Sequence, residues 1–156
     1  MSQDLVLGVH HPALVVADLE AALEFYSAFA GYEVVVRNSW DETSSFNEII
    51  GLRDSRAQFA VLKNRAGFLE LFEFETPKSE QVPGALKANE LGIRHLCFQV
   101  TNVPEALAYL VSLGGQKVGE PIKNERGVTS VYARDPFGHL IELLDPGAHL
   151  PGIDDA

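Results

Sequence analysis

The sequence HPALVVADLEAALEFYSAFAGYEVV at residues 11–35 has a similar second copy, HLCFQVTNVPEALAYLVSLGGQKVG, at residues 95–119. A constant shift of 84 residues aligns the two stretches without a gap, and it pairs His11 with His95. Self-similarity at a fixed shift is the signature of a structural unit that is used more than once. We therefore predict that the chain is built from two copies of one unit.

Each copy contains the same succession of local signals. An apolar run with β-branched residues predicts a strand, and Asp18 or Asn102 then provides a residue suited to cap a helix. The apolar residues that follow recur at helical spacing, and the helix is expected to stop at Gly31 or at Gly114–Gly115. A second strand begins directly afterwards in both copies.

The copies match again at their ends, RAGFLELFEF at residues 65–74 and PFGHLIELLD at residues 136–145. Each turns through a glycine into an apolar strand with one acid in its middle, Glu70 or Glu142. The first copy is about 12 residues longer between its histidine and its glutamate. The extra residues are expected in the polar segment around Trp40–Leu52, which fits either a lid or cavity wall or an ordinary surface loop.

These signals predict an α+β chain of two βαβββ modules. We expect the first module at residues 5–76, a proline-containing linker at 77–90, the second module at 91–146 and a tail at 147–156.

Composition limits the classes of partner. The chain has 12 basic and 22 acidic residues, a net charge of −10, which argues against nucleic acid and against anionic membrane surfaces. Cys97 is the only cysteine, so no intramolecular disulfide forms, and no apolar run approaches the roughly 20 residues of a membrane helix. The start has no pattern of a secretory signal. We expect a cytoplasmic protein whose partner is a small molecule.

The two strand acids indicate a metal site. Glu70 lies among Phe68, Leu69, Leu71 and Phe72, and neither acid has a lysine or arginine in its own strand. An isolated carboxylate among apolar neighbours is costly unless something neutralises it. One divalent ion held by all four repeat-related side chains would do so, and this N2O2 set suits Zn, Ni, Co, Mn or Fe(II). The predicted ligands are His11, Glu70, His95 and Glu142.

With these residues the chain resembles the vicinal oxygen chelate superfamily, which includes glyoxalase I, methylmalonyl-CoA epimerase, extradiol dioxygenases and bleomycin resistance proteins. The resemblance covers about residues 7–146 and rests on the opening stretch, on GIRHLCFQV and on YARDPFGHLIELL. It implies two modules that form an open eight-stranded cup around the metal, with the same four ligands. It also implies a homodimer.

The leading functional prediction is a metal-dependent lyase, isomerase or epimerase. Its substrate would be a small vicinal-oxygen compound, such as a 2-oxo acid, a hemithioacetal or a thioester, processed through a metal-bound enediolate. Glu70 and Glu142 are the candidate catalytic bases, and the wholly apolar strand around Glu142 favours it slightly. The residues after Glu70, LFEFETP, do not decide whether glutathione is a cosubstrate.

Two alternatives belong to other classes. An Fe(II) extradiol-type dioxygenase needs only three protein ligands, whereas this chain offers a fourth at Glu70. A non-catalytic drug-sequestering protein fits the acidic charge, but it has no use for a complete ligand set.

Alternation along the strands also sorts the remaining residues. Positions expected on the side of the acids are mostly apolar: Phe59, Val61, Phe72, Phe74 and Tyr132. Cys97 shares the face of His95, where we expect small-residue packing, and His10 is expected on the face opposite to His11.

Overall fold

The computed structural model describes residues 5–148 and 150–153, so positions 149 and 154–156 of the expected tail lie outside the described residues. The chain divides into two compact units, Met1–Glu80 and Gln81–Ala156. The division falls inside the segment expected to act as a linker, and each unit contains one copy of the repeat. Among the described residues, no helix is long and apolar enough to cross a membrane.

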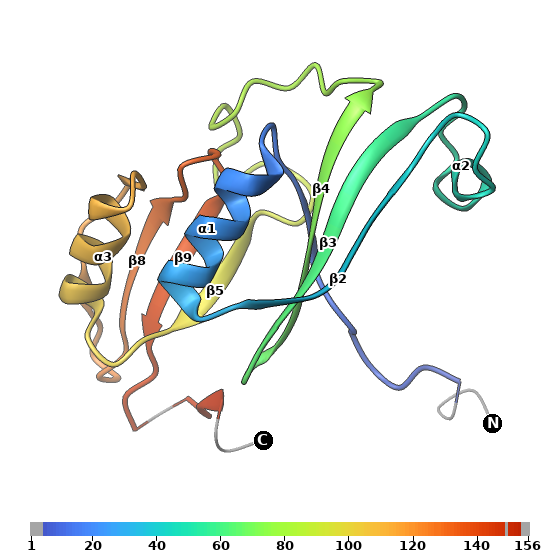
Figure 1. Ribbon diagram of the computed structural model, residues 1–156. Helices are drawn as coiled ribbons and strands as arrows, with labels where there is room; N and C mark the ends of the chain where they lie inside the picture. The colour runs from blue at the N-terminus through green and yellow to red at the C-terminus, as the bar shows by residue number, and fades with distance from the viewer. Residues whose placement is uncertain (1–4, 149, 154–156) are drawn as a thin grey trace. The chain divides into compact units, whose positions relative to one another are not determined.

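The first unit is a four-stranded sheet with one long helix. Its strand order is β1-β4-β3-β2, in which β1 runs parallel to β4 and the other pairs are antiparallel. In Figure 1, β2, β3 and β4 lie side by side as long, twisted strands. The elements are β1 (Ala13–Val15), α1 (Leu19–Ala30), β2 (Glu33–Trp40), α2 (Phe46–Ile50), β3 (Arg56–Asn64) and β4 (Gly67–Thr76).

The second unit repeats this arrangement with the order β5-β9-β8-β6, again with its first strand parallel to its last. The helix α3 packs against β8 and β9 and lies beside β8 in Figure 1. The elements are β5 (His95–Gln99), α3 (Val103–Ser112), β6 (Gln116–Lys117), β7 (Ile122–Lys123), β8 (Thr129–Arg134) and β9 (Leu140–Asp145). The α+β class with βαβββ units is therefore confirmed.

The second strand of the repeat is divided in the second unit, which gives nine strands among the described residues where eight were expected. The two short strands β6 and β7 pair with different parts of the same strand, β8. Between them, the N–H groups of Val118 and Gly119 both donate to the carbonyl of Tyr132, at 3.1 and 3.0 Å. Pro121 follows and has no N–H to donate, so regular pairing is interrupted until β7 begins at Ile122.

The helix ends differ slightly between the units. Gly31 follows α1 with a φ of 65°, while the positive φ after α3 belongs to Gly114, at 94°. The sequence alignment pairs Gly31 with Gly115, but α3 ends earlier than α1. Gly115 instead allows close packing, since a Cβ atom there would lie 2.1 Å from the Leu110 side chain.

Each core lies between the long helix and one face of the sheet. Strand side chains alternate between faces, so the buried neighbours of each acid direct that acid to the opposite face. Leu69 and Leu71 are fully buried on either side of Glu70, as are Ile141 and Leu143 on either side of Glu142. Burying one such side chain contributes roughly 1.5–3 kcal/mol. Core packing thus orients both glutamates.

Candidate functional site

In the first unit, His11 and Glu70 form a close pair. Nε2 of His11 lies 2.9 Å from Oε2 of Glu70, and the side chains are 32% and 14% exposed. The N–H of Glu70 donates to the carbonyl of Pro12 at 3.0 Å, and Ala13 is the register partner of Glu70. The parallel pairing of β1 with β4 therefore fixes the histidine beside the acid.

The second unit holds the equivalent pair in the same register. Nε2 of His95 lies 3.2 Å from Oε2 of Glu142, with side chains 34% and 19% exposed. Cys97 is the register partner of Glu142, just as Ala13 is that of Glu70. In both units, the histidine precedes that partner by two residues. The repeat thus extends to the geometry of the two pairs.

The donor atoms of each pair suit a divalent cation. In an octahedral site, two neighbouring ligand atoms that each lie about 2.1 Å from the ion are about 3 Å apart. The separations of 2.9 and 3.2 Å are close to that value and also match a hydrogen bond between an imidazole N–H and a carboxylate. Within either unit, the described residues include no group of three or more His, Cys, Asp or Glu side chains placed for a metal. Each unit by itself therefore supplies two of the four predicted ligands.

His10 belongs to the surroundings of the first pair, and the expectation that it faces away from His11 is wrong. Its ring stacks on Phe68, with centroids 4.7 Å apart and planes at 11°, and Phe68 shares the face of Glu70. Its Nδ1 lies 2.7 Å from Nδ1 of His11. The strand β1 begins only at Ala13, so strand alternation does not apply to these two histidines.

Cys97 and Tyr132 accompany the second pair. Partial burial raises the pKa of the Cys97 thiol to about 11, and the charge of Glu142 and a hydrogen bond with it add to the effect. Burial also raises the pKa of Tyr132, again with a contribution from Glu142. The tyrosine hydroxyl lies 3.3 Å from Nδ1 of His95. Strand alternation predicts that both residues lie on this face, but it does not predict their contacts.

Aromatic rings continue the Glu70 face along the first sheet. Phe72 and Phe74 alternate with Glu70 on β4, and Phe59 of β3 pairs with Phe72 at a centroid distance of 5.7 Å. Val61 is the β3 partner of Glu70. The apolar positions expected in the first module therefore do share the side of the acid.

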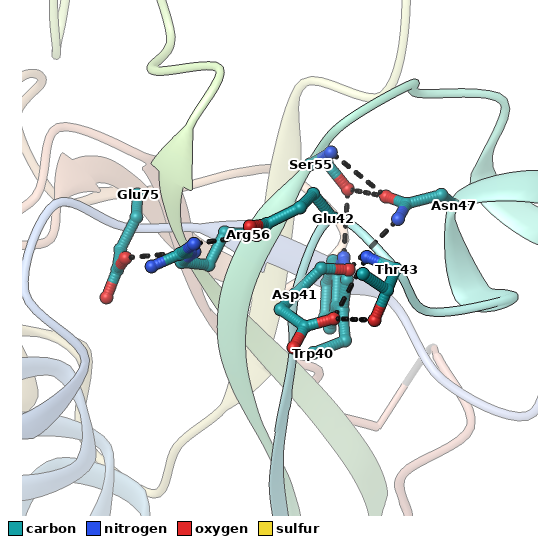
Figure 2. Close-up of polar contacts among 8 residues, drawn as sticks. All are labelled: Trp40, Asp41, Glu42, Thr43, Asn47, Ser55, Arg56 and Glu75. Carbon is teal, nitrogen blue, oxygen red and sulfur yellow. Dashed lines mark hydrogen bonds and ion pairs between the residues drawn. The ribbon is translucent and has the colours of Figure 1, made fainter.

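The segment between β2 and β3 is fixed against this aromatic face. Phe46 of α2 packs on Trp40 at 4.6 Å and lies nearly parallel to Phe59 at 6.2 Å. The indole N–H of Trp40 donates to the hydroxyl of Ser55 at 2.8 Å, and the Ser55 N–H donates to the side-chain oxygen of Asn47 at 3.1 Å (Figure 2). The insertion therefore packs against the aromatic face, and these contacts hold it there as a wall rather than as a free surface loop.

Charged residues form ion pairs where the insertion joins β3. Arg56 lies 2.6 Å from Glu42 and 3.8 Å from Glu75 (Figure 2), beside a polar hollow of about 450 Å³. Hydrogen bonds from Thr43 hold the pKa of Asp41 below its usual value. These contacts stabilise the insertion.

Sequence comparison matches the chain to the profile of one family and to related proteins. The profile of the glyoxalase/bleomycin resistance protein/dioxygenase superfamily matches residues 8–143. A 2-epi-5-epi-valiolone epimerase from an Actinomyces species is 30% identical over 154 residues, which cover 93% of this chain and 82% of that protein. A lactoylglutathione lyase from Schizosaccharomyces pombe is 27% identical over 149 residues, 92% of this chain but 49% of that one. The chain thus spans about half the length of the lyase.

Comparison of structures agrees with this family. A glyoxalase family protein from Bacillus cereus matches with a TM-score of 0.82 and 25% identity, over 93% of this chain and 97% of that one. A fosfomycin resistance protein from Listeria monocytogenes matches in fold, with a TM-score of 0.62 and 20% identity over 92% of this chain and 96% of that one. The chain belongs to the glyoxalase/bleomycin resistance protein/dioxygenase superfamily.

Proposed function

We propose that this protein is a metal-dependent lyase, isomerase or epimerase that acts on a small substrate with two adjacent oxygen atoms. The observation that carries the proposal is the recurrence of one His–Glu pair in the same register of both units. Two neutral imidazoles and two carboxylates balance a divalent cation, and their N and O donors suit Zn, Ni, Co, Mn or Fe. The ligands in this proposal are His11, Glu70, His95 and Glu142.

A divalent ion held by these residues would polarise the two substrate oxygens and acidify the neighbouring C–H bond. One of the two glutamates then takes the proton and returns it, to the same carbon in an epimerase or to another in an isomerase. Related proteins named as an epimerase and as a lyase support this class of reaction. Both glutamates lie next to a histidine and remain partly exposed, so either can reach a substrate.

The aromatic face supports a substrate that carries an apolar part. Phe72 follows Glu70 on the same face, and Phe59 and Phe46 extend it away from the acid. A 2-oxo acid, hemithioacetal or thioester with an apolar substituent would place its oxygens at the acid and its substituent against these rings. We further propose a homodimer, which the resemblance to the superfamily implies, and a location in the cytoplasm, with which a chain that has a single cysteine is compatible.

The test measures metal and proton exchange together. Purified protein is analysed for bound metals, stripped with a chelator and reloaded with single metals. Each form is incubated in D2O with aliphatic and aromatic 2-oxo acids and hemithioacetals, and NMR follows deuterium uptake at the carbon next to the oxygens. We expect a bound divalent ion, uptake only in the loaded form, and loss of metal in His11→Ala and His95→Ala. His139→Ala is the matched control, because this imidazole lies 2.8 Å from the buried Asp135 and belongs to neither pair.

Two results would contradict the proposal. Iron together with oxygen-dependent consumption of a catechol would assign the protein to ring-cleaving dioxygenases. Metal content that is the same in the wild type, His11→Ala and His95→Ala would remove the metal site and favour a non-catalytic binding protein. Equilibrium sedimentation of the loaded protein tests the dimer separately.

A further inference from the structure

The two His–Glu pairs differ in what surrounds their carboxylates. On an extended sheet, side chains that are register partners on neighbouring strands lie next to each other on the same face. The partners are Ala13 and Val61 for Glu70, but Cys97 and Tyr132 for Glu142. The first pair therefore has aliphatic strand neighbours, whereas the second has neighbours that form hydrogen bonds.

Tyr132 contacts the imidazole of His95 on the side away from the acid. Its hydroxyl lies 3.3 Å from Nδ1 of His95, and the two rings meet edge to face with centroids 5.1 Å apart and planes at 80°. The other ring nitrogen, Nε2, lies 3.2 Å from Glu142. The imidazole is thus held at both nitrogens, by a tyrosine on β8 and an acid on β9.

We propose that Tyr132 is a positioning residue that prepares His95 to bind a divalent metal through Nε2. This inference rests on the proposed function. A histidine that binds a metal through Nε2 carries its proton on Nδ1, and that N–H needs an acceptor. The hydroxyl oxygen of Tyr132 provides the acceptor, and the edge-to-face contact fixes the plane of the ring.

The chemistry of tyrosine suits this role better than that of the corresponding aliphatic residue. A phenol accepts and donates hydrogen bonds, so it can hold Nδ1 whether or not that nitrogen carries the proton. Val61, the counterpart in the first unit, can do neither. His11 has a different neighbour at Nδ1, the imidazole of His10 at 2.7 Å. The two ligand histidines are therefore held by different groups, and the tyrosine serves only His95.

The experiment titrates the apo protein with Co²⁺ and compares Tyr132→Phe with the wild type. Phenylalanine keeps the ring contact and removes only the hydroxyl. Loss of a group that orients a metal-ligating histidine typically weakens metal affinity about 10–100-fold. We expect a dissociation constant for Co²⁺ raised about tenfold, a changed visible spectrum of the bound Co²⁺, and an unchanged melting temperature of the apo protein. Tyr109→Phe, an exposed tyrosine on α3, is the matched control and should bind as the wild type does.

A second measurement tests the hydrogen bond directly. In the zinc-loaded wild type, the Nδ1–H proton of His95 should give a slowly exchanging NMR signal that disappears in Tyr132→Phe. Equal Co²⁺ affinity and equal spectra in Tyr132→Phe and the wild type would overturn the inference while leaving the metal site intact. Wild-type protein that binds Co²⁺ no better than His95→Ala would overturn both the inference and the proposed function.

Discussion

Asp18 and Asn102 cap the two long helices in the same way. Their backbone angles are φ −146°, ψ 107° and φ −150°, ψ 105°. Each side chain accepts a hydrogen bond from the N–H three residues later, Ala21 at 3.0 Å and Glu105 at 3.1 Å. These bonds satisfy N–H groups that have no partner inside the helix.

The caps should therefore contribute equally to stability. Asp18→Ala and Asn102→Ala should each lower the free energy of unfolding by about 1 kcal/mol, measured by denaturant titration. The exchange Asp18→Asn keeps the acceptor and should change little. Asn102→Asp also keeps it, but it removes the amide that donates to Glu105 at 2.8 Å and places a second negative charge there, so it should cost some stability. A cost in only one of the two alanine variants would mean that the helices depend on their caps to different degrees.

Part of the fold and the site could be predicted because it depends on periodicity. The shift that pairs His11 with His95 also pairs the caps, and alternation directed Glu70 and Glu142 to the face opposite the core. Features that depend on the termination of an element were not predicted. The approach of His10 to His11 follows from the late start of β1. The predicted stop at Gly114–Gly115 is confirmed, but the early end of α3 decides that Gly114 has the positive φ.

The sequence does not decide between a wall and a surface loop for the insertion, because its structure depends on contacts distant in sequence. Its hydrophobic residues show no period, and its closing hydrogen bond joins Trp40 to Ser55. No pattern in the sequence predicts that these two residues are partners. The same holds for the hydroxyl of Tyr132, since alternation gives its face but not its contact with His95.

The Trp40–Ser55 bond should be measurable. Ser55 is fully buried and Trp40 is 7% exposed, so Ser55→Ala leaves the indole N–H without its acceptor inside the protein. We expect a loss of about 1–3 kcal/mol in the free energy of unfolding. Trp40 is the only tryptophan, so its fluorescence reports unfolding and the local change together. Ser27→Ala, at an exposed position on α1, is the control. An unchanged emission spectrum in Ser55→Ala would count against the fixed wall.

Cys97 should react slowly despite its exposed position. A pKa of about 11 leaves little thiolate at pH 8. Reaction of the apo protein with iodoacetamide should then be about 10–20-fold slower than that of a free cysteine, since the higher nucleophilicity of the thiolate offsets part of the deficit. The rate should keep rising with pH up to about 11. Glu142→Gln should react faster, because it removes the negative charge. Equal rates in that variant and the wild type would exclude the influence of Glu142.

Metal binding should stabilise the fold. A ligand that binds only the folded state adds about 2.7 kcal/mol at a hundredfold excess over its dissociation constant. For a chain of this size we expect the melting temperature to rise by roughly 5–10 °C when the apo protein is loaded with its preferred metal. His95→Ala should show no such rise at the same metal concentration. Identical melting of apo and loaded wild-type protein would contradict the shared site.

The two glutamates should differ in kind when each is replaced by glutamine. Glutamine keeps an oxygen that can bind a metal, but it does not accept a proton as a base. The variant without the base should hold metal and bind substrate, yet exchange the substrate C–H proton with solvent about 10²–10⁴-fold more slowly. The other variant should lose mainly metal affinity and recover activity at high metal concentration.

We expect Glu142→Gln to be the variant that keeps metal and loses proton exchange. The sequence favours Glu142, because the two residues on either side of it on β9 are all apolar, whereas Glu73 and Glu75 follow Glu70 on β4. Metal content and deuterium uptake are measured on the same samples of both variants. The reverse pattern would assign the base to Glu70. Full turnover in both variants would mean that neither glutamate moves the proton, and the reaction would then belong to a different class of the superfamily.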